Sequence, residues 1–149
     1  MRAYFKNMIQ AYRGTCDGLV YYFNPRLNRI ICRPYTVPRA TGQNLRFAAI
    51  AKNLKALKPS DGFKADLGVY ANLHNGLARN YDHRLQNWYN AFTRMMWNLA
   101  RENPDTIDLA TISRAYIELH DLPCRSVMRA VDAGLLPSVT GYELLNQEM

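Results

Sequence analysis

The stretches Leu19-Val20-Tyr21-Tyr22-Phe23 and Arg29-Ile30-Ile31-Cys32-Arg33 decide the fold class of the first part of the chain. Both are rich in β-branched and aromatic residues, which is typical of β-strands. Between them, Asn24-Pro25-Arg26-Leu27-Asn28 has the composition of a turn. We therefore expect a β-hairpin within residues 18–37, whose second strand is limited by prolines because proline cannot donate a hydrogen bond to a ladder.

Both faces of this hairpin would be apolar. Alternation along the strands places Leu19, Tyr21, Phe23 and Ile31 on one face and Val20, Tyr22 and Ile30 on the other. An isolated two-stranded hairpin is only marginally stable in water, so its faces must be covered or its edge must pair with another chain. We therefore expect a homo-oligomer. The predicted subunit-interface residues are Leu19, Tyr21, Phe23, Ile31 and Trp97, the last because it falls off the apolar stripe of its helix.

The rest of the chain has helical periodicity. Capping and terminating residues predict helices at 1–13, between Thr41 and Pro59, between Ser60 and Gly76, from about Leu85 to Asn103, and at about 108–119, 122–133 and 140–148. We expect an α+β fold that is mainly α, with an N-terminal β-hairpin followed by five or six helices. A single domain over 1–149 would consist of a basic hairpin-plus-helix region, 14–58, and a helical region, 59–149.

The net charge of +7 is distributed unevenly along the chain. Residues 1–58 hold eleven basic residues against Asp17 alone, a net charge of +10, whereas residues 59–149 have a net charge of −3. A surface of one sign attracts polyanions, so the partner is either nucleic acid, DNA or RNA, or the acidic part of a neighbouring copy. The predicted phosphate-binding residues are Arg26, Arg29, Arg33, Arg39, Arg46, Lys52 and Lys55.

Aromatic residues lie among these cations, and they have two interpretations. Tyr21, Tyr22, Phe23 and Tyr35 would stack on unpaired bases if the region binds a single strand. Alternatively, the aromatic residues belong to the core and the arginines form a solvated rim or a bridge to a partner subunit. The pair Met95-Met96, which lies near two tryptophans, also has two interpretations: an exposed surface that binds a partner, or part of a helix stripe that faces the core.

Residues 117–131, Ile-Glu-Leu-His-Asp-Leu-Pro-Cys-Arg-Ser-Val-Met-Arg-Ala-Val, resemble a helix-turn-helix segment. The resemblance implies that Arg125, Ser126 and Arg129 face a DNA groove and read bases. Two positions depart from the pattern, since Ile117 is bulky where such segments have a small residue, and Asp121 replaces a glycine. Residues 105–135 also carry three arginines against five carboxylates. The alternative is a helical hairpin that closes the core.

A second resemblance covers residues 14–58. Gly-Leu-Val-Tyr-Tyr-Phe at 18–23, Arg33-Pro34, and the stretch from Pro38 to Phe47 are similar to the opening of small uncharacterised prokaryotic and phage-borne proteins. Those proteins place a hairpin before a helix start of the Pro-x-x-Thr-x-x-Asn/Gln-x-x-Arg-Phe type. The resemblance implies a phage or structural gene context and carries no activity.

Catalytic and metal-binding patterns are poor. Cys16, Cys32 and Cys124 are scattered, and neither they nor the three histidines lie in a nucleophile signature or at zinc-site spacing. We expect free thiols, no metal and no cofactor. The sequence has no apolar run long enough for a membrane helix or a signal peptide, so we expect a location in the cytoplasm or inside a viral particle.

These patterns favour a non-enzymatic nucleic-acid-binding protein that forms an oligomer. The alternative is a structural subunit of a self-assembling or phage particle, in which the hairpin makes the contacts between subunits.

Overall fold

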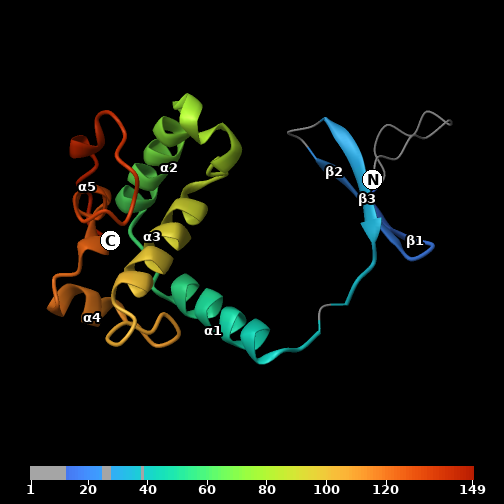
Figure 1. Cartoon of the computed structure of the whole chain (residues 1–149), viewed down its shortest axis with the longest axis horizontal. Coiled ribbons are helices and arrows are strands. Elements are labelled where there is room, and N and C mark those ends of the chain that lie inside the picture. Colours follow the sequence, from blue (N-terminus) through green and yellow to red (C-terminus); the bar gives the residue numbers. More distant parts are fainter. Residues whose placement is uncertain (1–12, 25–27, 38) are drawn as a thin grey trace. The chain divides into compact units, whose positions relative to one another are not determined.

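A three-stranded antiparallel sheet followed by five α-helices makes up the described part of the chain, residues 13–24, 28–37 and 39–149 of a computed structural model (Figure 1). The predicted α+β fold, mainly α and with the strands first, is confirmed. Residues 1–12 of the predicted first helix and Arg26 lie outside the described residues.

The sheet contains one strand more than the predicted hairpin. Its strands are β1 (Gly14–Cys16), β2 (Leu19–Asn24) and β3 (Arg29–Pro34), paired in the order β1-β2-β3. Asp17 and Gly18 join β1 to β2 with φ angles of 51° and 73°. A two-residue turn with both φ angles positive matches the right-handed twist of paired strands, and Asp-Gly is a preferred sequence for it. This turn lies between the predicted helix, 1–13, and the predicted hairpin, 18–37, where we had predicted no strand pairing.

The register of β2 and β3 corrects the predicted faces of the hairpin. Tyr22 pairs with Ile31, and Tyr21 pairs with Cys32. Residues that pair directly across two strands lie on the same face. Ile31 therefore shares a face with Tyr22, and its predicted placement beside Tyr21 and Phe23 is wrong. Alternation fixes the faces within each strand, but the length of the turn fixes how the two strands match, and a shift of one residue exchanges the faces.

The five α-helices are α1 (Gly42–Ala56), α2 (Asp61–Gly76), α3 (Trp88–Glu102), α4 (Arg114–Leu119) and α5 (Val127–Asp132), with short 3-10 turns η1 (Ala78–His83), η2 (Pro123–Arg125) and η3 (Tyr142–Leu144). The predicted starts of α1 and α2 are confirmed by their caps. The Thr41 hydroxyl accepts a hydrogen bond from the Asn44 amide at 3.2 Å, and the Ser60 hydroxyl accepts one from the Phe63 amide, also at 3.2 Å.

The later helices are shorter than predicted because internal residues cap them. Ser113 accepts a hydrogen bond from the Tyr116 amide at 3.1 Å, so α4 begins there and not near residue 108. Ser126 caps α5 in the same way and separates it from the 3-10 turn that begins at Pro123. The helix expected at 140–148 is reduced to η3.

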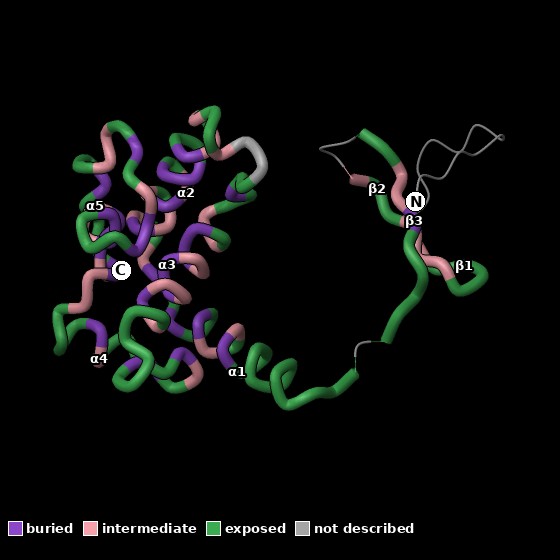
Figure 2. The backbone as a smooth tube through the Cα atoms, in the orientation of Figure 1, coloured by how far each residue is buried: buried purple, intermediate pink, exposed green. Residues whose placement is uncertain are grey.

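The hydrophobic core lies among the helices and begins in the second half of α1 (Figure 2). The rings of Phe63 on α2 and Phe92 on α3, both fully buried, meet edge to face with centroids 6.3 Å apart. Met95 and Met96 are also fully buried, so the core interpretation holds for this pair. The first turns of α1 differ, because Leu45 and Phe47 are 65% and 59% exposed.

The chain divides into two compact units, one ending at Ala40 and the other running from Thr41 to Met149. Helix α1 belongs to the second unit through buried Ile50 and Leu54, and the division into regions 14–58 and 59–149 stays a prediction. The single domain over 1–149 stays a prediction.

Candidate nucleic-acid interface

One face of the sheet carries two arginines around an aromatic ring. Arg29, Ile31 and Arg33 alternate along β3 and therefore point to the same side. Tyr22 lies directly opposite Ile31, which makes the two arginines its diagonal neighbours. Tyr22 is 36% exposed, and both arginines are exposed. The structure thus places two cations beside one accessible aromatic side chain.

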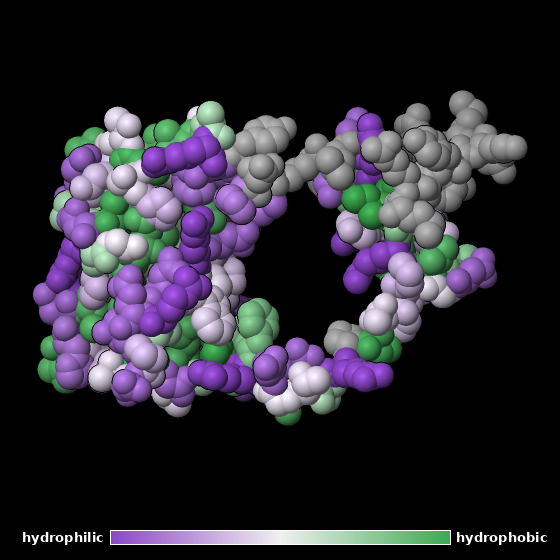
Figure 3. Space-filling model, viewed as in Figure 1, coloured by the Kyte–Doolittle hydropathy of each residue, from purple (hydrophilic) through white to green (hydrophobic). Residues whose placement is uncertain are grey.

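The cations predicted on α1 and before it separate into different environments. Lys52 and Lys55 are exposed on one side of α1 and line a groove. Arg46 lies instead in a separate depression that it shares with Trp97 and Arg101. Arg39 is exposed in the segment that precedes α1. Figure 3 shows hydrophilic and hydrophobic residues side by side over the exposed first turns of α1.

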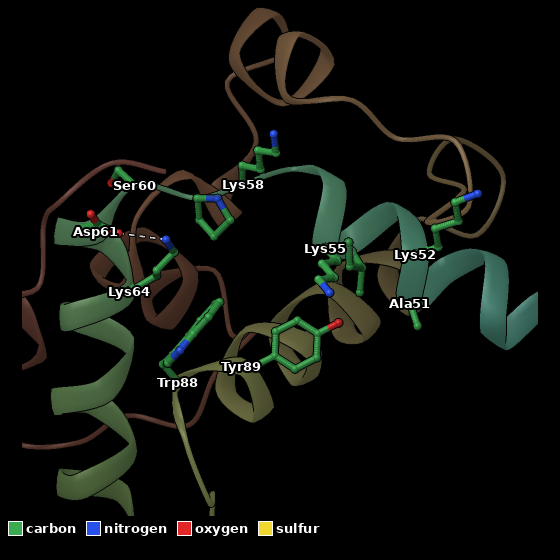
Figure 4. Close-up of a pocket in the computed structure, with 11 residues that line it drawn as sticks. Ala51, Lys52, Lys55, Lys58, Ser60, Asp61, Lys64, Trp88 and Tyr89 are labelled. Carbon is green, nitrogen blue, oxygen red and sulfur yellow. Dashed lines mark hydrogen bonds and ion pairs between the residues drawn. The ribbon is translucent and has the colours of Figure 1, made fainter.

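Lys52 and Lys55 belong to a groove of about 980 Å³, which we call the lysine groove (Figure 4). It lies where the end of α1, the start of α2 and the start of α3 meet. The residues that line it are Ala51, Lys52, Leu54, Lys55, Lys58, Pro59, Ser60, Asp61, Lys64, Trp88 and Tyr89. It combines four lysines with two half-buried aromatic residues.

The connection between α1 and α2 shapes the upper wall of this groove. Lys58 has a φ angle of 46°, in the left-handed region, and Pro59 follows it, so the helix cannot continue. Ser60 then caps α2, and its hydroxyl also donates to the Glu148 carbonyl at 2.7 Å. This anchoring to the last residues of the chain holds the connection in place above α3.

The aromatic wall of the groove is supported from below by the core. The Trp88 and Tyr89 rings are nearly perpendicular, with centroids 5.6 Å apart, and both contact the buried ring of Phe92. The Lys64 ammonium lies 5.9 Å from the centre of the Trp88 ring, at cation–π distance. The two rings are therefore held in fixed orientations while part of their surface stays accessible.

The charge of the groove is positive. Among the described residues that line it, Asp61 is the only acidic one, and it pairs with Lys64 at 2.8 Å, which holds the pKa of the Asp61 carboxyl below its usual value. Among the described residues, Lys52, Lys55 and Lys58 have no carboxylate partner. In Figure 4, Lys55 reaches toward the Tyr89 ring and Lys64 turns to Asp61, while Lys52 and Lys58 stand at the rim and point away from the rings.

The three predicted base-reading residues are engaged inside the helical unit. Arg125 pairs with Asp121 and with Glu148, in each case at 2.6 Å, and Arg129 pairs with Asp121 at 2.6 Å. Hydrogen bonds from Arg129 and then from Arg125 lower the pKa of Asp121 to about 2. Ser126 is 2% exposed and caps α5. To contact DNA, both arginines would first have to leave these ion pairs.

The turn within residues 117–131 has one feature of the helix-turn-helix pattern. Asp121 has a φ angle of 47°, the left-handed conformation that glycine adopts most readily. However, the two helices that flank the turn, α4 and α5, have six residues each. Ile117 and Val127 are buried, so the segment also closes the core as the alternative interpretation expects.

The cysteines and histidines do not form a reactive cluster in the described residues. All three cysteines are free. Burial raises the pKa of the Cys124 thiol to about 12, and the adjacent Asp17 carboxylate raises that of Cys16, so both shifts disfavour the nucleophilic thiolate. Within the same residues no three potential ligands among His, Cys, Asp and Glu lie together as a metal site would require.

The sequence prediction missed four of the six lysine and aromatic residues that line the lysine groove. Lys58, Lys64, Trp88 and Tyr89 were not among the binding residues that the sequence predicted. A signal was available, because Lys58-Pro59-Ser60 ends one helix and caps the next, which brings the cations of both helix ends together.

Comparison of the chain with known protein families, curated proteins and solved structures gave no match. Among the described residues, no helix has the length and apolar character needed to cross a bilayer. The function therefore has to be inferred from the geometry of the chain itself.

Proposed function

We propose that the protein is a non-enzymatic nucleic-acid-binding protein that acts in the cytoplasm or inside a viral particle. The observation that carries the proposal is the state of the cations in residues 29–58. Arg29, Arg33, Lys52 and Lys55 are exposed and have no carboxylate partner among the described residues, and Arg29, Arg33 and Lys55 lie beside aromatic side chains.

Exposed cations without carboxylate partners are suited to bind an external polyanion and do not stabilise the fold through internal ion pairs. Lysine and arginine supply most of the sequence-independent affinity for nucleic acids by neutralising phosphates and releasing condensed counterions. Phosphate contacts position a protein on a strand without selecting a sequence. The cations occur in both units, on β3 and on α1, so each unit can contribute phosphate contacts.

Size-exclusion chromatography with absorbance at 260 and 280 nm, in low and high salt, tests this proposal. We expect nucleic acid to co-purify in low salt and to dissociate in high salt. In titrations with a labelled oligonucleotide, log K should fall linearly with log salt, with a slope of about −0.9 per duplex phosphate neutralised and about −0.7 for a single strand. Absence of binding to any oligonucleotide in low salt would overturn the proposal.

A second candidate function is favoured by the exposed apolar side chains. Leu45 and Phe47 on α1, and Phe23 on β2, are each more than 40% exposed. In a structural subunit of a self-assembling or phage particle, these residues would lie between copies of the chain. Light scattering on the eluted protein distinguishes this function, because a large oligomer free of nucleic acid and resistant to high salt would support assembly through apolar contacts.

A further inference from the structure

The lysine groove has a chemical composition that phosphate binding alone does not require. Its walls include Trp88, Tyr89, Leu54 and Pro59 in addition to the lysines. A site for phosphates alone needs only cations and amide groups, whereas these side chains offer flat aromatic and apolar surface. The occupant should therefore combine negative charge with a flat, weakly polar ring.

Unpaired nucleotides have this combination. In a duplex the faces of the bases are stacked on one another and cannot reach a protein ring, but in a single strand they stack on tryptophan and tyrosine. From this we infer that the lysine groove binds single-stranded nucleic acid, with bases stacked on Trp88 and Tyr89 and with Lys55 near the phosphates. This inference rests on the proposed function and specifies the form of nucleic acid that the helical unit binds.

The charge of the helical unit supports a local polyanion site. Residues 41–149 contain twelve basic and eleven acidic residues, so the unit as a whole is nearly neutral. The groove nevertheless gathers four of those twelve cations against Asp61 alone. An acidic peptide would satisfy the lysines equally well, but it would leave the two aromatic rings without a stacking partner.

The dimensions of the groove are compatible with more than one nucleotide. Its volume of about 980 Å³ is at the upper end of the range of roughly 300–1,000 Å³ that is usual for small-molecule pockets. Lys52 and Lys58 stand at the rim and point outward, where a strand that leaves the groove would carry its next phosphates (Figure 4).

Tryptophan fluorescence tests the inference directly, because the chain has only two tryptophans. In the Trp97→Phe variant, Trp88 is the sole tryptophan and reports on the groove. We expect a short oligothymidine to quench its emission and to bind more tightly than a duplex of the same length. Polyglutamate, the control polyanion without rings, should bind weakly and leave the emission unchanged.

Two variants and one matched control test the residues. Tyr89→Ala should weaken binding of the single strand by about fivefold or more, because one stacked base is lost, and should leave duplex binding unchanged. Lys55→Ala removes one exposed charge and should reduce the salt slope for the single strand by about 0.7. Arg101→Ala removes an exposed charge outside the groove and should have neither effect. Thermal unfolding shows whether each variant is folded. If Tyr89→Ala does not fold, Lys55→Ala serves as the test.

The results separate this inference from the proposed function. If the protein binds oligonucleotides but shows no preference for a single strand and no quenching of Trp88, the inference is wrong while the proposed function stands. Equal quenching by polyglutamate would also overturn the inference, in favour of an acidic protein partner. If no oligonucleotide binds at all, both fail.

Discussion

Residues 29–58 and residues 114–149 both carry closely spaced basic side chains, and the structure uses them in opposite ways. In the first region Arg29, Arg33, Lys52 and Lys55 are exposed and have no carboxylate partner among the described residues. In the second region Arg114, Arg125 and Arg129 all pair with carboxylates. In the second region the ion pairs of Asp121 hold the turn before α5 and the pair of Arg125 with Glu148 joins it to the last residues of the chain, whereas Arg29, Arg33, Lys52 and Lys55 stay accessible to a partner.

This difference shows that the number of carboxylates near an arginine predicts whether it is accessible better than the sequence motif in which it lies. Asp17 is the only acidic residue in positions 1–58, so the cations there have few internal partners to choose from. Asp121 and Glu148, in contrast, lie within reach of Arg125. The helix-turn-helix resemblance pointed to the arginines that the fold neutralises, and the charge distribution pointed to those that it leaves accessible.

The largest expected effect contrasts a phenylalanine of the helical core with one in the exposed start of α1. Phe92→Ala should destabilise the protein by about 3–5 kcal/mol, because it removes a fully buried ring that supports Trp88 and Tyr89. Phe47→Ala, at a side chain that is 59% exposed, should change stability by less than about 0.5 kcal/mol. Urea denaturation measures both. A comparable loss in Phe47→Ala would mean that the start of α1 is covered in solution, as the particle-subunit function requires.

The next effect concerns a titratable group that the helical unit hides. His74 is 1% exposed, and burial lowers its pKa below the ordinary 6.5. The unfolded chain therefore binds a proton more readily than the folded one, so stability should be complete above pH 6.5 and should fall as the pH drops below it. Unfolding free energies measured at several pH values check this. A variant in which Gln replaces this histidine, His74→Gln, should lose that part of the pH dependence, and an unchanged profile would contradict the prediction.

The smallest effect concerns the ion pairs around Asp121. Arg129 and Arg125 lower the pKa of this carboxyl from 3.8 to about 2. Its contribution to stability should therefore be present above pH 3.8 and should be lost as the pH falls through about 2. Because the carboxylate is exposed, we expect only a slight lowering of the unfolding midpoint at neutral pH in Asp121→Asn. Acid unfolding curves of the two proteins test this prediction. If Asp121→Asn loses as much stability at acid pH as the unmodified protein, the ion pairs of Asp121 are not the cause of that loss.

The sequence was sufficient to predict the parts of the fold that depend on local signals. Thr41 and Ser60 mark the starts of α1 and α2 by side-chain capping, and Asn103-Pro104 marks the end of α3. Strand β1 was missed although Asp17-Gly18 is a strong hairpin signal, because the preceding residues have helical spacing. The strand register, which places Ile31 on the same face as Tyr22, depends on the geometry of the turn, and amino-acid composition does not specify that geometry.

The candidate site was only partly predictable for a similar reason. The excess of cations before residue 58 identified Lys52 and Lys55. Trp88 and Tyr89 lie more than thirty positions further along the chain, and only the packing of α3 beneath the α1–α2 connection brings them to these lysines. The ion pair of Arg125 with Glu148 likewise joins residues that are distant in sequence, so no local pattern reveals that this arginine is occupied.

The most direct measurement compares two matched double variants, Arg29→Ala/Arg33→Ala and Arg125→Ala/Arg129→Ala, each of which removes two arginines. For each variant, oligonucleotide affinity is titrated over a range of salt concentrations and the thermal unfolding midpoint is recorded. We predict that the first variant reduces the salt slope by nearly 2 for a duplex and keeps its midpoint, while the second lowers the midpoint and keeps the slope. Loss of nucleic-acid binding in the second variant, with no change in the first, would contradict the account.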